Sequence, residues 1–120
     1  MPSDINVILE GEWLSVPDIM ERAGTPQATV RTWLADRDLI GMRRGPNHAL
    51  MVPAAFVLPA GPLKSLRGTV SVLGDSGLSD PEILTWLGRS DDTLPGGSAI
   101  GGLLAGHKTE VRRRAMELAF

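Results

Sequence analysis

The chain of 120 residues has no cysteine and only two histidines. Without cysteine it can form no disulfide, no thiolate zinc site and no thiol nucleophile. The histidines, His48 and His107, lie 59 positions apart, so a shared imidazole site for zinc or iron is not expected. We therefore expect neither a bound metal nor another cofactor.

Long apolar runs are missing as well. The N-terminal dozen residues have no basic start, and their apolar run, residues 7–9, is too short for a secretory signal. No stretch approaches the roughly 18 apolar residues that a membrane-spanning helix requires. We expect a cytoplasmic protein without a membrane partner.

Motifs of common enzyme classes are also absent. No G-x-S-x-G nucleophile motif occurs, and the glycine-rich segment 96–102 lacks the lysine and hydroxyl residue of a phosphate-binding loop. Asp91 and Asp92 fall in a turn-rich stretch, where hydrated carboxylates are the simpler interpretation. The sequence predicts that the chain is not an enzyme.

The net charge of −2 hides an uneven distribution. Residues 1–24 carry five acids and one arginine, whereas residues 25–48 carry four arginines and two acids; the remainder balances seven against seven. A locally basic segment is compatible with DNA binding, because local charge matters more than net charge.

Two short helices are predicted between residues 15 and 35. Ser15 and Asp18 have the spacing of a capping box, and Gly24 suits the left-handed end of the first helix. Thr25 is expected to cap the second helix, with Pro26 in its first turn. Apolar residues at helical spacing should form a small shared core. They are Ile19, Ala23, Val30 and Trp33.

A β-hairpin is predicted next, because two short apolar runs between residues 39 and 53 flank a Gly-Pro-Asn-His turn. Two helices around a tight glycine turn, followed by a hairpin, have the order of a winged helix-turn-helix. The proline-rich segment 53–62 reads as a connector. Capped helical patterns follow it, ending in a helix over residues 108–119.

The predicted fold is thus mainly α with a small β-hairpin. Residues 1–12 are expected to be a flexible lead-in, and residues 13–58 a winged helix-turn-helix. Residues 59–120 are expected to form a helical C-terminal subdomain packed on it.

The outer face of the second helix is the predicted DNA-reading surface. Gln27 and Arg31 lie one turn apart there, and these side chains can pair bidentately with adenine and guanine in the major groove. Basic side chains of the hairpin would contact phosphates or the adjacent minor groove. A solvent face that is merely hydrated is the alternative interpretation. The predicted DNA-binding residues are Thr25, Gln27, Ala28, Arg31, Thr32, Arg37, Arg43, Arg44, Asn47 and His48.

Several segments also resemble a known family. They are LSVPD at 14–18 with Gly24, VP at 52–53, LKSL at 63–66, EILTWL at 82–87 and EVRRRA at 110–115. They are similar to the actinobacterial winged-helix DNA-binding proteins whose mycobacterial member is a substrate of a Ser/Thr protein kinase. The likeness runs from about Trp13 to Phe120.

The resemblance implies a winged helix with a helical C-terminal part, double-stranded DNA as partner, and a place on the nucleoid of an actinobacterial cytoplasm. The phosphoacceptor threonine of that family lies in an N-terminal extension. Residues 1–12 of this chain offer Ser3 and no threonine, which argues against kinase regulation.

Two functions remain open at this point. The first is a DNA-binding transcriptional regulator or nucleoid-type protein. The second is a protein-interaction module, such as an antitoxin-like partner that uses the C-terminal helices. Those helices either pack on the winged helix or pair with a second copy in a homodimer. Salt-sensitive binding to duplex DNA is required by the first function only.

Overall fold

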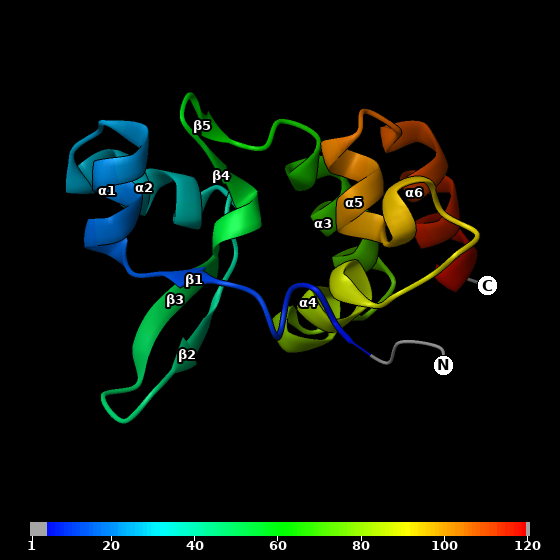
Figure 1. The fold of residues 1–120 in the computed structure, drawn as a ribbon, viewed down its shortest axis with the longest axis horizontal. Helices are drawn as coiled ribbons and strands as arrows, with labels where there is room; N and C mark the ends of the chain where they lie inside the picture. Colours follow the sequence, from blue (N-terminus) through cyan, green and yellow to red (C-terminus); the bar gives the residue numbers. More distant parts are fainter. Residues whose placement is uncertain (1–4, 120) are drawn as a thin grey trace.

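The computed structural model describes residues 5–119 and shows two lobes side by side (Figure 1). One lobe contains the first two helices and the strands, and the other contains the remaining helices. This is the predicted class, mainly helical with a small antiparallel sheet. Ser3, which entered the expectation about kinase regulation, lies outside the described residues.

The two helices of the first lobe are α1 (Val16–Ala23) and α2 (Gln27–Ala35). The capping box of Ser15 and Asp18 is confirmed, and Gly24 ends α1 with a left-handed φ of 61°. The start of α2 differs from the prediction. Pro26, and not Thr25, occupies the N-cap, and no side chain caps this helix.

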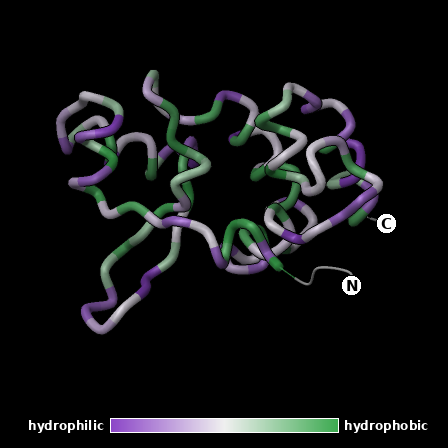
Figure 2. The backbone as a smooth tube through the Cα atoms, in the orientation of Figure 1, coloured by the Kyte–Doolittle hydropathy of each residue, from purple (hydrophilic) through white to green (hydrophobic). Residues whose placement is uncertain are grey.

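The predicted hairpin is present and joins a three-stranded antiparallel sheet. Strands β2 (Met42–Arg44) and β3 (Ala49–Pro53) form the hairpin, and β1 (Trp13–Leu14) pairs with the other edge of β3. The hairpin projects away from the helices as a wing (Figure 1). Its tip is hydrophilic, and the strands become hydrophobic toward the body of the protein (Figure 2).

The segment expected to be a connector has structure of its own. A 3-10 turn (Ala54–Phe56) is followed by a second small hairpin of β4 (Val57–Leu58) and β5 (Gly61–Pro62). Gly61 has a φ of 126°, and a Cβ atom there would lie 3.4 Å from the ring of Trp33. A proline-rich sequence carries no alternating pattern, so this hairpin was not predicted.

Four helices make up the second lobe. They are α3 (Leu66–Asp75), α4 (Asp80–Gly88), α5 (Ala99–Leu104) and α6 (Lys108–Met116), with 3-10 turns at Pro95–Gly97 and Glu117–Ala119. Ser79 and Glu82 form a capping box at the start of α4. The final helix is shorter than predicted, and Leu118 is 43% exposed instead of buried. The chain leaves the α-helical path after Met116, so Leu118 does not continue the buried face.

The lead-in is the clearest departure from the sequence prediction. Its described part, residues 5–12, is anchored on α4. The amide of Asn6 donates to the Thr85 carbonyl at 2.8 Å, and the Val7 N–H donates to the Gly88 carbonyl at 3.0 Å. Ile8 is 1% exposed. This segment therefore contributes to the core and is not a flexible lead-in.

One hydrophobic core extends through both lobes. It joins Ile19, Val30 and Phe56 of the first lobe to Leu66 and Leu84 of the second. Trp33, expected to lie within it, is only half-buried against its edge. No helix within residues 5–119 is long and apolar enough to cross a membrane.

Candidate nucleic-acid interface

The outer face of α2 has the exposure that the helical pattern predicts. Val30 turns inward and is fully buried, whereas the residues on the opposite side are exposed. The exposed residues are Gln27, Ala28, Arg31, Thr32 and Ala35. The three alanine and threonine side chains are short, so another surface could approach the helix backbone closely at their positions.

Gln27 and Arg31 form a pair on this face. With the Gln27 amide turned so that its oxygen faces Arg31, the orientation that satisfies both groups, this oxygen accepts hydrogen bonds from Nη2 and Nε of Arg31, at 2.9 and 3.3 Å. The pair holds both side chains over the same turn of α2. Because the oxygen of Gln27 is occupied, the groups left for a ligand are the Gln27 amide N–H groups and the remaining guanidinium N–H groups, all of them donors.

Thr25 and Thr32 offer less to a ligand than the sequence suggested. The hydroxyl of Thr32 donates to the Ala28 carbonyl at 3.1 Å, one turn earlier. Thr25 is half-buried in the turn between α1 and α2, and its backbone N–H donates to the Met20 carbonyl at 3.1 Å. Thr25 therefore supports the entry to α2 and presents little surface.

The tip of the wing is braced by one of its arginines. Arg43 donates from Nη1 to the His48 carbonyl at 3.0 Å, and the His48 N–H closes the turn on the Gly45 carbonyl at 3.1 Å. His48 has a left-handed φ of 50°. Arg43, Asn47 and His48 are all exposed, so the tip carries a cation and polar groups on an ordered turn.

Arg44 points to the other face of the wing, as the alternation of strand side chains requires. Its guanidinium carbon lies 4.2 Å from the centre of the Trp13 ring, the geometry of a cation–π contact. Arg44 stays exposed in this position. The sequence analysis did not select Trp13, because only the pairing of β1 with β3 brings it beside the wing.

Arg37, also a predicted DNA contact, is engaged by the second lobe. Its guanidinium forms two hydrogen bonds with the carboxylate of Asp80 on α4, at 3.0 and 2.8 Å. The hydrogen bonds to Asp80 raise the pKa of Arg37. A second ion pair between the lobes joins Arg67 to Asp38 at 3.6 Å. Arg37 thus connects the two lobes.

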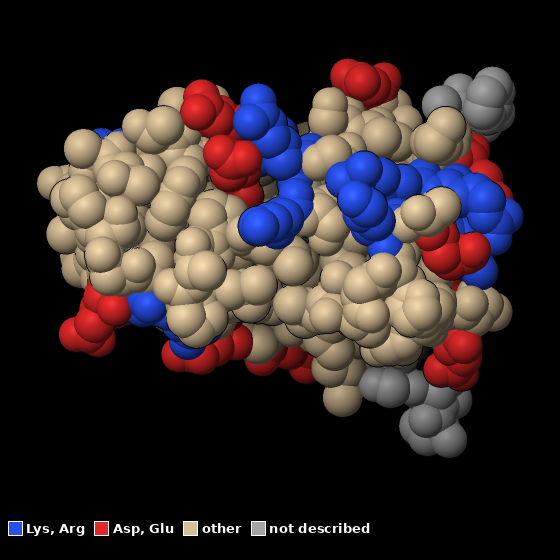
Figure 3. Space-filling model, turned by 90° about the horizontal axis from the view of Figure 1, so that it is seen from above, with Lys and Arg blue, Asp and Glu red and all other residues tan. Residues whose placement is uncertain are grey.

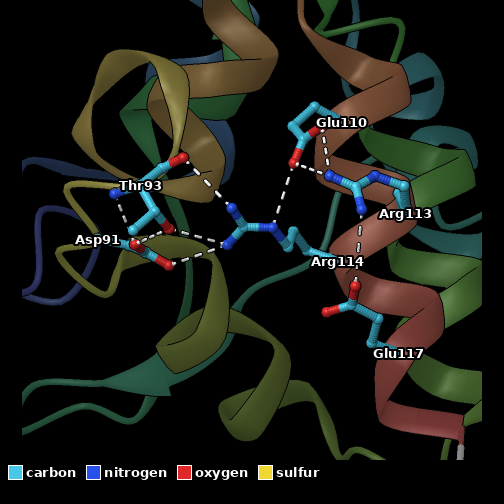
Figure 4. A network of polar contacts seen from close by, with 6 residues as sticks. All are labelled: Asp91, Thr93, Glu110, Arg113, Arg114 and Glu117. Carbon is cyan, nitrogen blue, oxygen red and sulfur yellow. Dashed lines mark hydrogen bonds and ion pairs between the residues drawn. The ribbon is translucent and has the colours of Figure 1, made fainter.

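The three consecutive arginines of α6 diverge around the helix, and Arg113 and Arg114 contact nearby carboxylates. Arg114 contacts Asp91 at 3.5 Å and the Thr93 hydroxyl at 3.0 Å, and also Glu110 (Figure 4). The hydrogen bond from Arg113 lowers the pKa of Glu110, and hydrogen bonds from Thr93 lower the pKa of Asp91. This network fastens the loop before α5 to α6.

A metal centre has no candidate in the described part of the chain. No three His, Cys, Asp or Glu side chains within residues 5–119 are grouped so that they could hold an ion. His48 lies in the wing and His107 precedes α6, in different lobes.

Comparison with known proteins relates both lobes to one family. Residues 1–57 match the model described as "DNA-binding protein Rv2175c, wHTH domain", and residues 63–119 match "Rv2175c C-terminal domain of unknown function". The DNA-binding protein Rv2175c of Mycobacterium tuberculosis is 29% identical, over 88% of this chain and 79% of the relative. An NMR structure of Rv2175c covers the whole chain and 90% of its own, with a TM-score of 0.77 and 26% identity.

Proposed function

Because residues 1–57 carry the winged helix-turn-helix domain of the Rv2175c family and residues 63–119 its C-terminal domain, we propose that this chain is a double-stranded DNA-binding protein. In this proposal α2 enters the major groove, and the wing lies on the backbone or in the adjacent minor groove. The observation that carries it is the paired Gln27 and Arg31 on the exposed face of α2.

The chemistry of the α2 face favours guanine. The side chains of Gln27 and Arg31 present donors, because the Gln27 oxygen is already bonded. Guanine offers two acceptors, O6 and N7, in the major groove, and arginine contacts both in its commonest specific interaction. Short side chains at Ala28 and Ala35 let the helix approach the base edges. The preferred site therefore contains guanine opposite Arg31.

The wing supplies sequence-independent affinity. Arg43 is held at the tip by His48, and Arg44 lies over Trp13 nearer the base of the wing. Ordered arginines lose less side-chain entropy when they bind phosphate, and the narrow minor groove attracts arginine. We assign the protein to the cytoplasmic nucleoid, as a transcriptional regulator or a nucleoid-type architectural protein.

The test is the salt dependence of duplex binding, measured by fluorescence anisotropy. Each phosphate that a cation neutralises changes the slope of log affinity against log salt concentration by about 0.9. The double change Arg43→Ala, Arg44→Ala should flatten this slope by about one to two units and weaken specific and random duplexes by similar factors. A wild-type protein that retains no duplex even at low ionic strength would refute DNA binding.

A regulator and an architectural protein differ in selectivity. Selection of genomic fragments by the purified protein should enrich a defined guanine-containing site if the protein is a regulator. Uniform recovery of fragments, with the same salt dependence, would favour the architectural role.

A further inference from the structure

Three cationic side chains gather where the start of α3 meets the start of α6. Lys64 and Lys108 line the same surface groove, of about 370 Å³, together with Ser65. Arg112 donates from Nη2 to the Ser65 carbonyl at 3.3 Å, and its guanidinium covers Gly68, where a Cβ atom would displace it. We call Lys64, Lys108 and Arg112 the α3–α6 basic surface. In the view from above, Lys and Arg side chains gather on the exposed face of the C-terminal lobe (Figure 3).

The positive charge of this surface is not neutralised locally. Among residues 5–119, no carboxylate lies within 4.0 Å of any of its three cations. Residues 63–119 carry equal numbers of acids and bases, but several of these acids are occupied elsewhere. Asp80 binds Arg37, and the carboxylates of Asp91 and Glu110 bind Arg114.

Arg112 adds a further charge beside the lysines. Its side chain is partly buried, and its Nε atom, which solvent does not reach, has no hydrogen-bond acceptor among the described residues. The lysines are exposed, and neither has a hydrogen bond to another described side chain. Two mobile ammonium groups beside an anchored guanidinium form a surface suited to phosphate oxygens, since both side chains bind phosphate well.

We propose that the α3–α6 basic surface binds backbone phosphates of the same duplex that α2 reads. This inference rests on the proposed DNA binding and assigns a role to the C-terminal lobe within it. The molecule is 38 Å long, and its lobes follow one another along that axis (Figure 1). One turn of B-DNA measures about 34–36 Å. The whole molecule thus spans about one turn of the duplex.

The ties between the lobes make this second contact effective. The shared core and the ion pair of Arg37 with Asp80 fix the basic surface relative to α2. Once α2 is bound, the second contact forms within the same complex, without a further loss of translational freedom. The cations of both lobes then act on one DNA molecule.

The test compares Lys64→Ala, Lys108→Ala with a control that removes the same charge elsewhere, Arg89→Ala, Arg113→Ala. On a random duplex of about 24 base pairs, the lysine variant should have a salt slope shallower than wild type by about two units, from about 0.9 per contact. The control should keep the wild-type slope to within about half a unit. Circular dichroism verifies that both variants are folded.

A second measurement separates a defined contact from general loss of charge. The second duplex has the same length, but neutral methylphosphonates replace the phosphates outside the segment that α2 covers, so the basic surface has no charged partner on it. Wild type and the lysine variant should bind this neutralised duplex with the same affinity, whereas the variant should be weaker on the unmodified one.

Each other result overturns the inference in a recognisable way. The lysine variant can keep the wild-type salt slope on the unmodified duplex while Arg43→Ala, Arg44→Ala flattens it. In that case the α3–α6 basic surface does not bind DNA, and the proposed function stands. If the lysine variant binds both duplexes more weakly by the same factor, the two lysines act only through the overall charge, and the inference is wrong. If the wild-type protein binds neither duplex, the proposed function fails with it, and an acidic protein partner becomes the explanation of the basic surface.

Discussion

Arg37, just beyond the end of α2, binds Asp80, at the start of α4, through two hydrogen bonds of 3.0 and 2.8 Å. The two residues belong to different lobes and are 43 positions apart in the chain. Arg37 reaches Asp80 from a left-handed backbone conformation, with φ at 65°. The pair thus couples the position of the candidate reading helix to the C-terminal lobe.

The variant Arg37→Ala should reduce stability only slightly. The side chains of Arg37 and Asp80 are 46% and 38% exposed, and exposed ion pairs contribute at most about 1 kcal/mol. Urea unfolding of Arg37→Ala, Asp80→Asn and the double variant should give a coupling energy in that range. Affinity for DNA should change less than in Arg31→Ala. A loss as large as that of Arg31→Ala would return Arg37 to the set of DNA contacts.

Arg31→Ala should lose about 1–3 kcal/mol of affinity for the preferred site, the range for one bidentate base contact. Its loss on random duplex should be smaller, and its unfolding midpoint should not change, because the side chain is exposed. Arg89→Ala removes the same charge from the other lobe and serves as the control. Identical isotherms for Arg31→Ala and wild type on the preferred site would exclude Arg31 as a base reader.

Phe56→Ala should be among the most destabilising substitutions in the first lobe. Phe56 is fully buried in the core that joins the lobes, and truncation of such a side chain costs about 3–5 kcal/mol. Trp33→Ala should cost less, because Trp33 is half-buried at the core edge beside Gly61. Chemical unfolding of the two variants measures the order. The reverse order would place the main anchor at Trp33, as the helical pattern had suggested.

Stability should decrease in acid partly through the network around Arg114. Hydrogen bonds from Arg113 lower the folded-state pKa of Glu110, and those from Thr93 lower that of Asp91. A carboxyl whose pKa is lowered by folding stabilises the protein above its unfolded pKa, and this stability disappears as the pH falls through the folded pKa. The contribution is therefore complete above about pH 5 and is lost progressively as the pH falls below the unfolded-state pKa values of about 4.

Thermal midpoints between pH 7 and pH 3 test this assignment. The variant Asp91→Asn, Glu110→Gln has lost both titrating groups, so its midpoint should fall less steeply with acid than that of wild type. Asp92→Asn, which removes a neighbouring carboxylate outside the network of Figure 4, is the control. Parallel curves for wild type and the double variant would show that the network does not contribute to acid sensitivity.

The features that could be predicted from the sequence are local ones. The capping boxes at Ser15 and Ser79 each involve residues three positions apart, and the left-handed end of α1 depends on Gly24 alone. The hairpin follows from a turn flanked by two short apolar runs. The exposed face of α2 follows from helical periodicity, which separates Val30 from Arg31 whatever lies around the helix.

The errors have a common origin in contacts between distant residues. Residues 5–12 seemed a flexible lead-in because nothing near them explains why Ile8 is buried; its partners lie on α4. The ion pair of Arg37 could not be predicted, because Asp80 is far along the chain. Trp33 is half-buried at the edge of the core, where Gly61 of the β4–β5 hairpin lies against its ring.

The amino-acid sequence by itself determined where the first two helices and the wing hairpin lie, and which face of α2 is apolar. These properties depend on backbone geometry and on side chains within about one helical turn. Only the tertiary structure decided which charges are free to bind. Arg37 and Arg114 are engaged by distant carboxylates, whereas Lys64 and Lys108 have none nearby. Pairing between charges depends on the separation of their side chains in space, and the packing of the two lobes sets that separation.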